Sequence, residues 1–321
     1  MDINFIDLFA GVGGFHYAFN NKAKCVFSSE WDKNARETYL ANWGEDLQKE
    51  NADFAGDITK VNYDKLPNFD ILCGGFPCQA FSIAGKKLGF NDTRGTLFFN
   101  ILEIVKAKKP RVVFLENVKN LTSHDKGNTF KVILASLEEL GYLVHHKVLN
   151  GSTHGNVPQN RERIFIVAFK NKKDFERFEF PKEEKRITQL KDVIDFNKKV
   201  DDKYYYKAEK SEISKRISEG VNKEETIYQF RRYYLREMKN GVCPTLTANM
   251  GTGGHNVPII LTKHGVRKLT PRECFSLQGY PKDFKLPEKL SNAALYKQAG
   301  NSVVVTVVKR IAENILKAIK D

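Results

Sequence analysis

The segment Gly-Gly-Phe-Pro-Cys-Gln at residues 74–79 contains a cysteine whose surroundings suit nucleophilic chemistry. Residues 69–73 form a short apolar run, which predicts a buried strand that the two glycines end. Pro77 then stiffens the turn that presents Cys78, and a thiol on a rigid turn can be aimed at an electrophile. We therefore interpret Cys78 as a nucleophile. Cys73, inside the strand, is interpreted as a small buried apolar residue, as most unpaired cysteines are.

Charged side chains stand at the ends of two other predicted strands. Glu116 directly follows the apolar run 111–115, at the carboxyl end of a strand, where open α/β sheets build their sites. Arg161 and Arg163 lie in a loop before the run 163–169, and an extended backbone would place both on one side. Two such guanidinium groups can bind a phosphate or a carboxylate. The alternatives are a solvated acid at a strand end and a solvated basic turn.

A glycine-rich loop at residues 10–15 connects a strand at 3–9 to a short helix, as in nucleotide-type sites. The second strand, 25–29, ends at Glu30, whose position suits binding of two ribose hydroxyls. The glycines do not follow the GxGxxG spacing, so the dinucleotide fingerprint is absent. Trp31 is either an adenine-stacking residue or a core or hinge aromatic, and Asp57 either binds a ligand amine or starts a turn.

Strands and helices alternate through the first half of the chain. Together with runs at 56–58 and 145–150, the strands already named predict an α/β fold with a doubly wound, mostly parallel seven-stranded sheet. Helices are expected at about 32–43, 97–108, 129–140 and 301–320, and the last should pack back on the sheet. Asp32 and Thr270 are predicted N-caps, the latter followed by Pro271.

The alternation stops near residue 181, and the chain becomes rich in Lys, Glu, Arg and Tyr. We predict a catalytic and cofactor-binding domain formed by 1–181 plus 289–321. Residues 182–288 would form a second, smaller domain. Within it, 228–236 interleaves basic with aromatic residues, as nucleic-acid surfaces often do, although a strand with one charged face fits equally well.

The chain carries 52 Lys and Arg against 39 Asp and Glu, a net charge of +13, which favours a polyanionic partner, nucleic acid first. No apolar run is long enough to span a membrane, and the N-terminus lacks the pattern of a signal peptide. Five cysteines without CxxC spacing argue against a disulfide framework and against a zinc site. We expect a protein of the reducing cytoplasm, without a metal.

Taken together and in order, several of these segments resemble those of the bacterial C5-cytosine DNA methyltransferases. The resemblance spans nearly the whole chain except about 182–240, and its length resembles that of the compact enzymes of restriction–modification systems. The segments that carry it are 7–15 (DLFAGVGGF), 76–79 (FPCQ), 116–118 (ENV), 159–163 (QNRER), 272–273 (RE) and 300–303 (GNSV).

The resemblance assigns four residues to catalysis. Cys78 would add to carbon-6 of cytosine, which makes carbon-5 nucleophilic, and Glu116 would stabilise the ring near N3 if burial raises its pKa. Arg163 would orient Glu116 or the ring. Arg161 would contact the cytosine edge or help to position Cys78.

The resemblance also implies S-adenosylmethionine as the methyl donor. Glu30 would bind the ribose, Trp31 and Ile58 would flank the adenine, and Asp57 would meet the adenine amine. Asn301 and Ser302 would close the methionine end. The complete expected set is Phe9, Gly11, Gly13, Gly14, Glu30, Trp31, Asp57, Ile58, Asn301 and Ser302.

The expected partner is double-stranded DNA, bound by a monomer, with the target cytosine flipped out of the helix. The loop 79–96 would clamp the duplex, and about 225–262 would read base edges in the major groove. The residues expected to contact DNA are Gln79, Ser82, Lys86, Arg94, Arg231, Arg232, Arg236, Thr247, Asn249, Gly253 and Gly254.

Three other functions remain to be separated from this one. A tRNA methyltransferase of the same fold would use another substrate, although the long basic segment 182–262 favours DNA. A non-catalytic nucleic-acid binder would be expected to lack Cys78 or Glu116. A nicotinamide oxidoreductase is disfavoured by the missing GxGxxG and by the Pro77–Cys78 turn.

Overall fold

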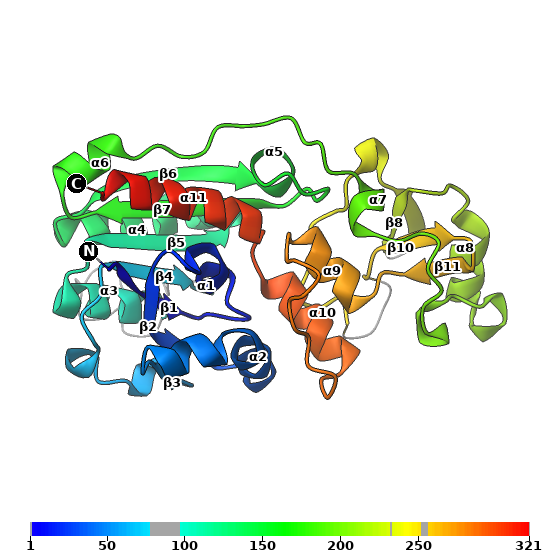
Figure 1. Ribbon diagram of the computed structural model, residues 1–321. Coiled ribbons are helices and arrows are strands. Elements are labelled where there is room, and N and C mark those ends of the chain that lie inside the picture. Colours follow the sequence, from blue (N-terminus) through cyan, green and yellow to red (C-terminus); the bar gives the residue numbers. More distant parts are fainter. Residues whose placement is uncertain (1, 78–96, 232, 252–255, 321) are drawn as a thin grey trace. The chain divides into compact units, whose positions relative to one another are not determined.

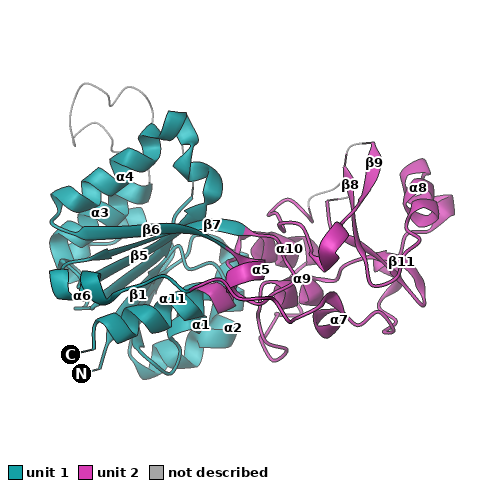
Figure 2. Ribbon diagram, turned by 90° about the horizontal axis from the view of Figure 1, so that it is seen from above, with its two compact units in different colours: residues 1–149, 162–181, 308–321 teal, residues 150–161, 182–307 magenta. Residues whose placement is uncertain are grey.

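The computed structural model describes residues 2–77, 97–231, 233–251 and 256–320. The chain divides into two compact units (Figure 2). Unit 1 comprises residues 1–149, 162–181 and 308–321, and unit 2 comprises residues 150–161 and 182–307. Unit 2 therefore differs from the predicted domain 182–288 by including 150–161 and 289–307. These segments belong together because Gly151 and Gly155 pack closely against Val304 and Thr306.

Unit 1 contains the predicted seven-stranded sheet, in the order β3-β2-β1-β4-β5-β7-β6. Neighbouring strands from β3 to β5 are parallel, and β7 is antiparallel to β5. The order reverses direction between β1 and β4, which is the topological switch point of a doubly wound sheet. The strands are β1 (Asn4–Leu8), β2 (Lys24–Ser29), β3 (Asp53–Ala55), β4 (Ile71–Gly75), β5 (Val112–Val118), β6 (Leu143–Asn150) and β7 (Glu162–Phe169).

Helices cover both faces of this sheet (Figures 1 and 2). On one face lie α1 (Gly14–Phe19), α2 (Lys33–Lys49) and α11 (Val305–Ala318), and on the other lie α3 (Leu97–Lys108) and α4 (Asn128–Glu139). The strands are apolar on both sides because both faces are covered. The α3 and α4 side chains Ile101, Leu102, Ile133 and Leu137 join strand residues in one buried core. A short helix, α6 (Lys172–Arg177), follows β7.

The predicted helix starts are confirmed at two positions. Asp32 Oδ1 accepts the backbone N–H groups of Asn34 and Ala35, which satisfies two donors at the start of α2. Thr270 caps α9 (Pro271–Leu277) in a capping box with Glu273.

Unit 2 is built on a four-stranded antiparallel sheet in the order β11-β10-β8-β9. The strands are β8 (Ile227–Arg231), β9 (Tyr234–Glu237), β10 (Ile259–Thr262) and β11 (Gly265–Lys268). One apolar side packs with α8 (Glu212–Gly220), where Ile217 joins Tyr228, Phe230 and Ile259 in a small core. The remaining helices are α5 (Gly151–His154), α7 (Leu190–Val193), α9 and α10 (Asn292–Asn301).

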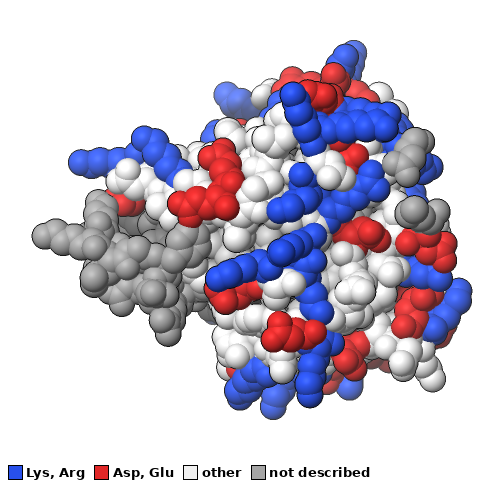
Figure 3. Space-filling view, turned by 90° about the vertical axis from the view of Figure 1, so that its left-hand side faces the viewer, with Lys and Arg blue, Asp and Glu red and all other residues white. Residues whose placement is uncertain are grey.

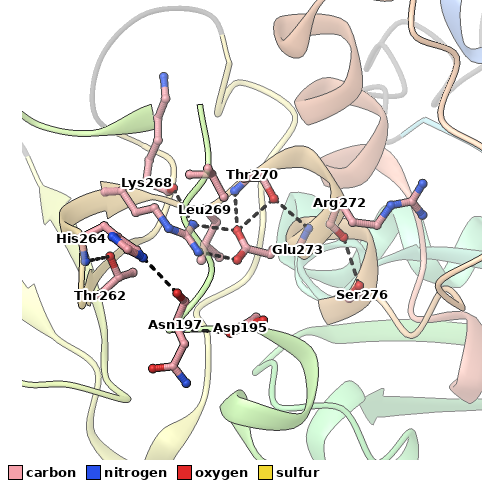
Figure 4. A network of polar contacts seen from close by, with 12 residues as sticks. Asp195, Asn197, Thr262, His264, Lys268, Leu269, Thr270, Arg272, Glu273 and Ser276 are labelled. Carbon is pink, nitrogen blue, oxygen red and sulfur yellow. Dashed lines mark hydrogen bonds and ion pairs between the residues drawn. The ribbon is translucent and has the colours of Figure 1, made fainter. Parts of the chain in front are cut away.

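A buried ion pair connects β11 to the start of α9 (Figure 4). The Arg267 guanidinium, which is fully buried, donates from Nη1 to Glu273 Oε2 at 2.8 Å and from Nη2 to Oε1 at 2.6 Å. The same carboxylate accepts the backbone N–H and the hydroxyl of Thr270. A buried pair needs such additional partners, because desolvation otherwise outweighs the attraction between the charges.

Charges of both signs intermingle on the face shown in Figure 3, so the net positive charge does not form one uninterrupted patch there. Among the described residues, no helix is long and apolar enough to cross a membrane.

Candidate active site

Glu116 and Arg163 meet at the carboxyl-end edge of the unit 1 sheet. Glu116 lies near the end of β5, and Arg163 lies near the start of the antiparallel β7, so both reach the same edge. Arg163 Nε donates to Glu116 Oε1 at 3.0 Å, and both side chains are largely buried. Burial lowers the pKa of Arg163, and the charge of the Glu116 carboxylate opposes that shift. The pair holds a carboxylate at the carboxyl end of β5, an edge at which open α/β sheets build their sites.

The end of β4 lies directly beside this carboxylate. Gly75 is the register partner of Glu116, and a Cβ added at Gly75 would lie 3.4 Å from Glu116 Oε2. Asn117 Nδ2 donates to the carbonyl of Phe76 at 2.8 Å, which fixes the backbone as it leaves β4. The sequence analysis names Asn117 only as part of the segment 116–118. Its positioning contact could not be predicted from residue type.

The glycine loop between β1 and α1 takes backbone conformations that the sequence motif requires. Gly11 has φ 55° and Gly13 has φ 87°, in the left-handed region that glycine adopts without strain. Phe9 also has a positive φ of 55°. Glu30 Oε2 accepts the N–H of Gly11 at 2.8 Å, and Oε1 accepts the N–H of Asp32 at 2.7 Å. Glu30 thus lies against the glycine loop.

Two residues that the sequence analysis did not single out, Trp43 and His16, stabilise this loop. The indole N–H of Trp43 in α2 donates to the carbonyl of Val12 at 3.2 Å. The ring also lies so close to Gly13 that a Cβ there would collide with it. His16 stacks on Trp43 with centroids 4.7 Å apart, and its Nδ1 is 2.7 Å from the Tyr39 hydroxyl. In the sequence, apolar spacing along the helix indicates only that Trp43 packs in the core, and it does not show the hydrogen bond to Val12.

The predicted adenine-side residues occupy different environments. Trp31 is 73% exposed, so it is not a core aromatic, whereas Ile58 is 4% exposed. Asp57 caps a short 3-10 helix, because Oδ1 accepts the backbone N–H and the hydroxyl of Thr59. Asp57 therefore begins a turn. Gly14 begins α1.

Arg161 belongs to a different unit from Arg163 and makes a different set of contacts. Its guanidinium is 2% exposed and donates to three backbone carbonyls of unit 2, those of Leu246, Gly300 and Ser302. Arg163 instead belongs to unit 1 and pairs with Glu116. The strand alternation used in the prediction does not apply, because β7 begins only at Glu162. The described contacts of Arg161 support a positioning role.

The remaining described candidates all lie in unit 2. Asn301 is exposed at the end of α10, and the Ser302 hydroxyl lies 2.7 Å from that of Tyr280. Arg231, Arg236, Thr247 and Asn249 are exposed. The candidates that fall outside the described residues are Cys78, Gln79, Ser82, Lys86, Arg94, Arg232, Gly253 and Gly254.

Comparison with known proteins identifies the class to which this fold and site belong. The family model of the C-5 cytosine-specific DNA methylases matches residues 3–317. The chain therefore belongs to the C-5 cytosine-specific DNA methylase family.

Two curated relatives match over nearly their full length. The chain is 52% identical over 314 residues to the type II methyltransferase M.Bsp6I of Bacillus sp. (strain RFL6), covering 97% of this chain and 98% of the relative. It is 44% identical over 325 residues to the type II methyltransferase M.HhaI of Haemophilus parahaemolyticus, with coverages of 98% and 94%.

A solved structure of the Dnmt2 methyltransferase of S. pombe has the same fold. Its TM-score is 0.74 at 19% identity, and the match covers 99% of this chain and 100% of that one. At this level of identity, the likeness concerns the fold alone.

Proposed function

We propose that the protein methylates carbon-5 of a cytosine within one short duplex DNA site, using Cys78 as the nucleophile. The observation that carries this proposal is the position of the Glu116–Arg163 pair. The pair lies beside Gly75, the residue at which β4 ends, and Cys78 follows three residues later in the sequence. Attack on a pyrimidine ring requires a nucleophile and an acidic group. Glu116 is the acidic group, and the segment that follows β4 carries the thiol of Cys78.

The other cysteines support the assignment by their environments. Cys25, Cys73, Cys243 and Cys274 are buried and unpaired. Burial raises the pKa of each thiol, that of Cys25 to about 12. A thiol with a raised pKa is rarely ionised, so these four are poor nucleophiles. Cys78 is therefore the favoured candidate.

In the proposed reaction, the Cys78 thiolate forms a bond to carbon-6, and the electron pair of the 5,6 double bond becomes available at carbon-5. Glu116 in its protonated form donates a proton to N3 as the bond to carbon-6 forms, which neutralises the charge that develops on the ring, and Arg163 orients the Glu116 carboxyl group. S-adenosylmethionine would supply the methyl group to carbon-5 and leave as S-adenosylhomocysteine. After methylation, N3 returns its proton to Glu116, carbon-5 loses its proton to a base, the double bond re-forms, and the Cys78 thiolate leaves carbon-6.

The described residues at the glycine loop fit an adenosine-type methyl donor. A Cβ placed on Gly11 would meet no atom within 4 Å, so the loop has open space in front of it. The N–H groups of Gly11 and Asp32 hold the Glu30 carboxylate beside the loop, where a carboxylate can bind ribose hydroxyls. Trp31 presents an exposed ring that an adenine can stack on. We assign Phe9, Gly13, Gly14, Asp57 and Ile58 to this site, and Asn301 and Ser302 to its methionine end.

Unit 2 is proposed to read the DNA. On the β8–β9 hairpin, Gln229 pairs in register with Arg236, and Arg231 pairs with Tyr234. These four side chains share the face opposite the small core, and Arg231 Nε donates to Gln229 Oε1 at 2.9 Å. A two-stranded ribbon fits the major groove, where arginine and glutamine recognise purines by paired hydrogen bonds.

The relatives are type II methyltransferases, which supports a role in protecting DNA within a restriction–modification system. We further propose that the protein acts as a monomer in the cytoplasm, because flipping one base requires only one active site.

The test is transfer of labelled methyl groups from S-adenosylmethionine to mixed-sequence duplex DNA and, in parallel, to tRNA. Bisulfite sequencing then locates the methylated cytosines. We expect label on duplex DNA at one recurring short site. Label on tRNA alone would replace the DNA substrate, and no label on either would contradict the enzymatic function.

A further inference from the structure

The loop at residues 245–251 of unit 2 is fixed along its backbone. The Leu246 N–H donates to Gln159 Oε1 at 3.2 Å, and its carbonyl accepts from Arg161 Nη1 at 2.7 Å. Leu246 and Met250 are buried, whereas Thr247 and Asn249 are exposed and joined by a 2.6 Å hydrogen bond. The loop thus presents two polar side chains from an immobilised backbone.

The second terminal nitrogen of the Arg161 guanidinium, Nη2, binds a different segment, residues 300–302. Arg161 Nη2 donates to the carbonyl of Gly300 at 2.9 Å and to that of Ser302 at 2.5 Å. These two carbonyls flank Asn301, which the proposed function assigns to the methyl donor. The donor of each hydrogen bond is the charged guanidinium, which makes the bond stronger than one between neutral groups.

The two segments also touch directly at a glycine. A Cβ placed on Gly300 would overlap the carbonyl of Thr247 and the N–H of Ala248, so any other residue would push the loop away from α10. A Cβ placed on Gly251 would lie 2.7 Å from Ala293 Cα, so this glycine also packs closely against the α10 backbone. We call Arg161, Gly300 and the backbone of 246–248 and 300–302 the anchor.

We propose that Arg161 is a positioning residue shared by DNA reading and methyl-donor binding. The inference rests on the proposed function, which places Asn301 and Ser302 on the donor, and on the expectation from the sequence that Thr247 and Asn249 contact DNA. One guanidinium sets the backbone that carries both pairs. Loosening the anchor therefore weakens sequence discrimination and donor affinity together, while the groups at the reacting cytosine stay in place.

Two substitutions test the anchor from opposite sides. Arg161→Lys keeps the charge but cannot hold three carbonyls in a fork geometry, and Gly300→Ala forces the loop off α10. Donor affinity is measured by calorimetry without DNA, and discrimination by kcat/KM on the methylated site against single-base variants. Both quantities should fall about tenfold in each variant, the effect of losing roughly one charge-assisted hydrogen bond. The kcat at saturating substrates should change less than about threefold.

The matched control is Arg267→Lys, another buried arginine of unit 2 whose partner is Glu273 rather than the anchor. It should lower the melting temperature while leaving donor affinity and discrimination unchanged. Hydrogen exchange of amides 246–250 and 300–303 supplies a readout without donor or DNA. These amides should exchange faster in Arg161→Lys and Gly300→Ala, and not in the control.

The outcomes separate the shared role from the proposed function. If the wild-type protein bound no donor and methylated no duplex, the proposed function and the shared role would both be wrong. If the wild-type protein were active and Arg161→Lys changed only one of the two quantities, the shared role alone would be overturned. A fall in kcat with both quantities unchanged would instead place Arg161 in the chemistry, and equal losses in the control would reduce its role to general stability.

Discussion

Each unit of this protein contains an arginine–glutamate pair, and the two pairs are built differently. Arg267 and Glu273 in unit 2 make two parallel hydrogen bonds, and Thr270 gives the same carboxylate two more. Glu116 and Arg163 in unit 1 meet at the edge of the sheet, where Arg163 Nε lies 3.0 Å from Glu116 Oε1. The first pair is enclosed by its own partners, whereas the second lies where the strands end.

The difference shows that residue type does not determine what a buried ion pair does. In unit 2 the carboxylate is also the N3 residue of the α9 capping box, so the pair holds β11 against a helix start. In unit 1 the carboxylate lies next to the glycine that ends β4, in the region that leads to Cys78. Position at the carboxyl-end edge of the sheet, rather than burial, separates a catalytic candidate from a structural pair.

The largest expected effect is on catalysis in unit 1. Glu116→Gln should lower the rate of methyl transfer by about 10²- to 10⁴-fold, because an amide cannot transfer a proton to N3 when the thiolate adds to the ring. Single-turnover transfer to duplex DNA measures the rate, and a gel-shift titration should show DNA affinity largely retained. Glu162→Gln is the matched control, since Glu162 lies at the same edge in an exposed pair with Lys119. A Glu116 variant as fast as this control would remove Glu116 from the mechanism.

The second effect is on stability in unit 2. Glu273→Gln should reduce the free energy of unfolding by about 3–5 kcal/mol, because it leaves the fully buried Arg267 charge without its counter-charge. Urea denaturation measures the loss. Glu237→Gln, in the exposed pair with Lys223, should change stability by at most about 1 kcal/mol. Equal losses in the two variants would contradict the structural role of the enclosed pair.

A smaller effect is expected beneath the glycine loop. Trp43→Phe keeps an aromatic ring against His16 but deletes the N–H bond to Val12, which should weaken donor binding about fivefold, or ~1 kcal/mol. Leu47→Ala, one turn further along α2, should destabilise the fold by about 2–5 kcal/mol without changing donor affinity. Calorimetry gives the affinities. Unchanged binding in Trp43→Phe would show that the indole only fills space.

The smallest effect concerns pH. Burial lowers the pKa of His16, although the Asp46 carboxylate opposes that shift. Below the unfolded pKa of 6.5, the unfolded chain therefore binds more protons at this residue, and stability falls as pH drops from 6.5 toward the folded pKa. Denaturation midpoints at pH 7.5 and pH 5.5 should differ more for the wild type than for His16→Gln. Equal differences would show that His16 does not titrate on unfolding.

Much of unit 1 could be predicted from local sequence, because apolar spacing and capping residues indicate its strands and helices. The helix expected at 97–108 is α3, and Asp32 caps α2, as Thr270 caps α9 in unit 2. The end of a third strand was expected at 56–58, and β3 ends just before it at Ala55. Glu116 and Glu30 were found because strand ends meet at one edge of such a sheet.

The partners of Arg161 could not be predicted. Its guanidinium binds carbonyls 85 and 139 residues further along the chain, and a backbone carbonyl leaves no trace in residue type. The same holds for the bond from Trp43 to Val12, which spacing along a helix indicates only as core packing. Side-chain contacts to distant backbone atoms depend on the tertiary fold, so they become visible only with it.

The most direct test of the mechanism is whether Cys78 becomes covalently attached to a cytosine in duplex DNA. A duplex with 5-fluorocytosine at the methylated position should retain the adduct, because fluorine replaces the proton that must leave carbon-5 before the thiol can depart. In the presence of S-adenosylmethionine, peptide mass mapping should locate the attached base on Cys78, and Cys78→Ser should give no adduct and no methylation. Methylation that persists in Cys78→Ser, or an adduct on another residue, would contradict the account.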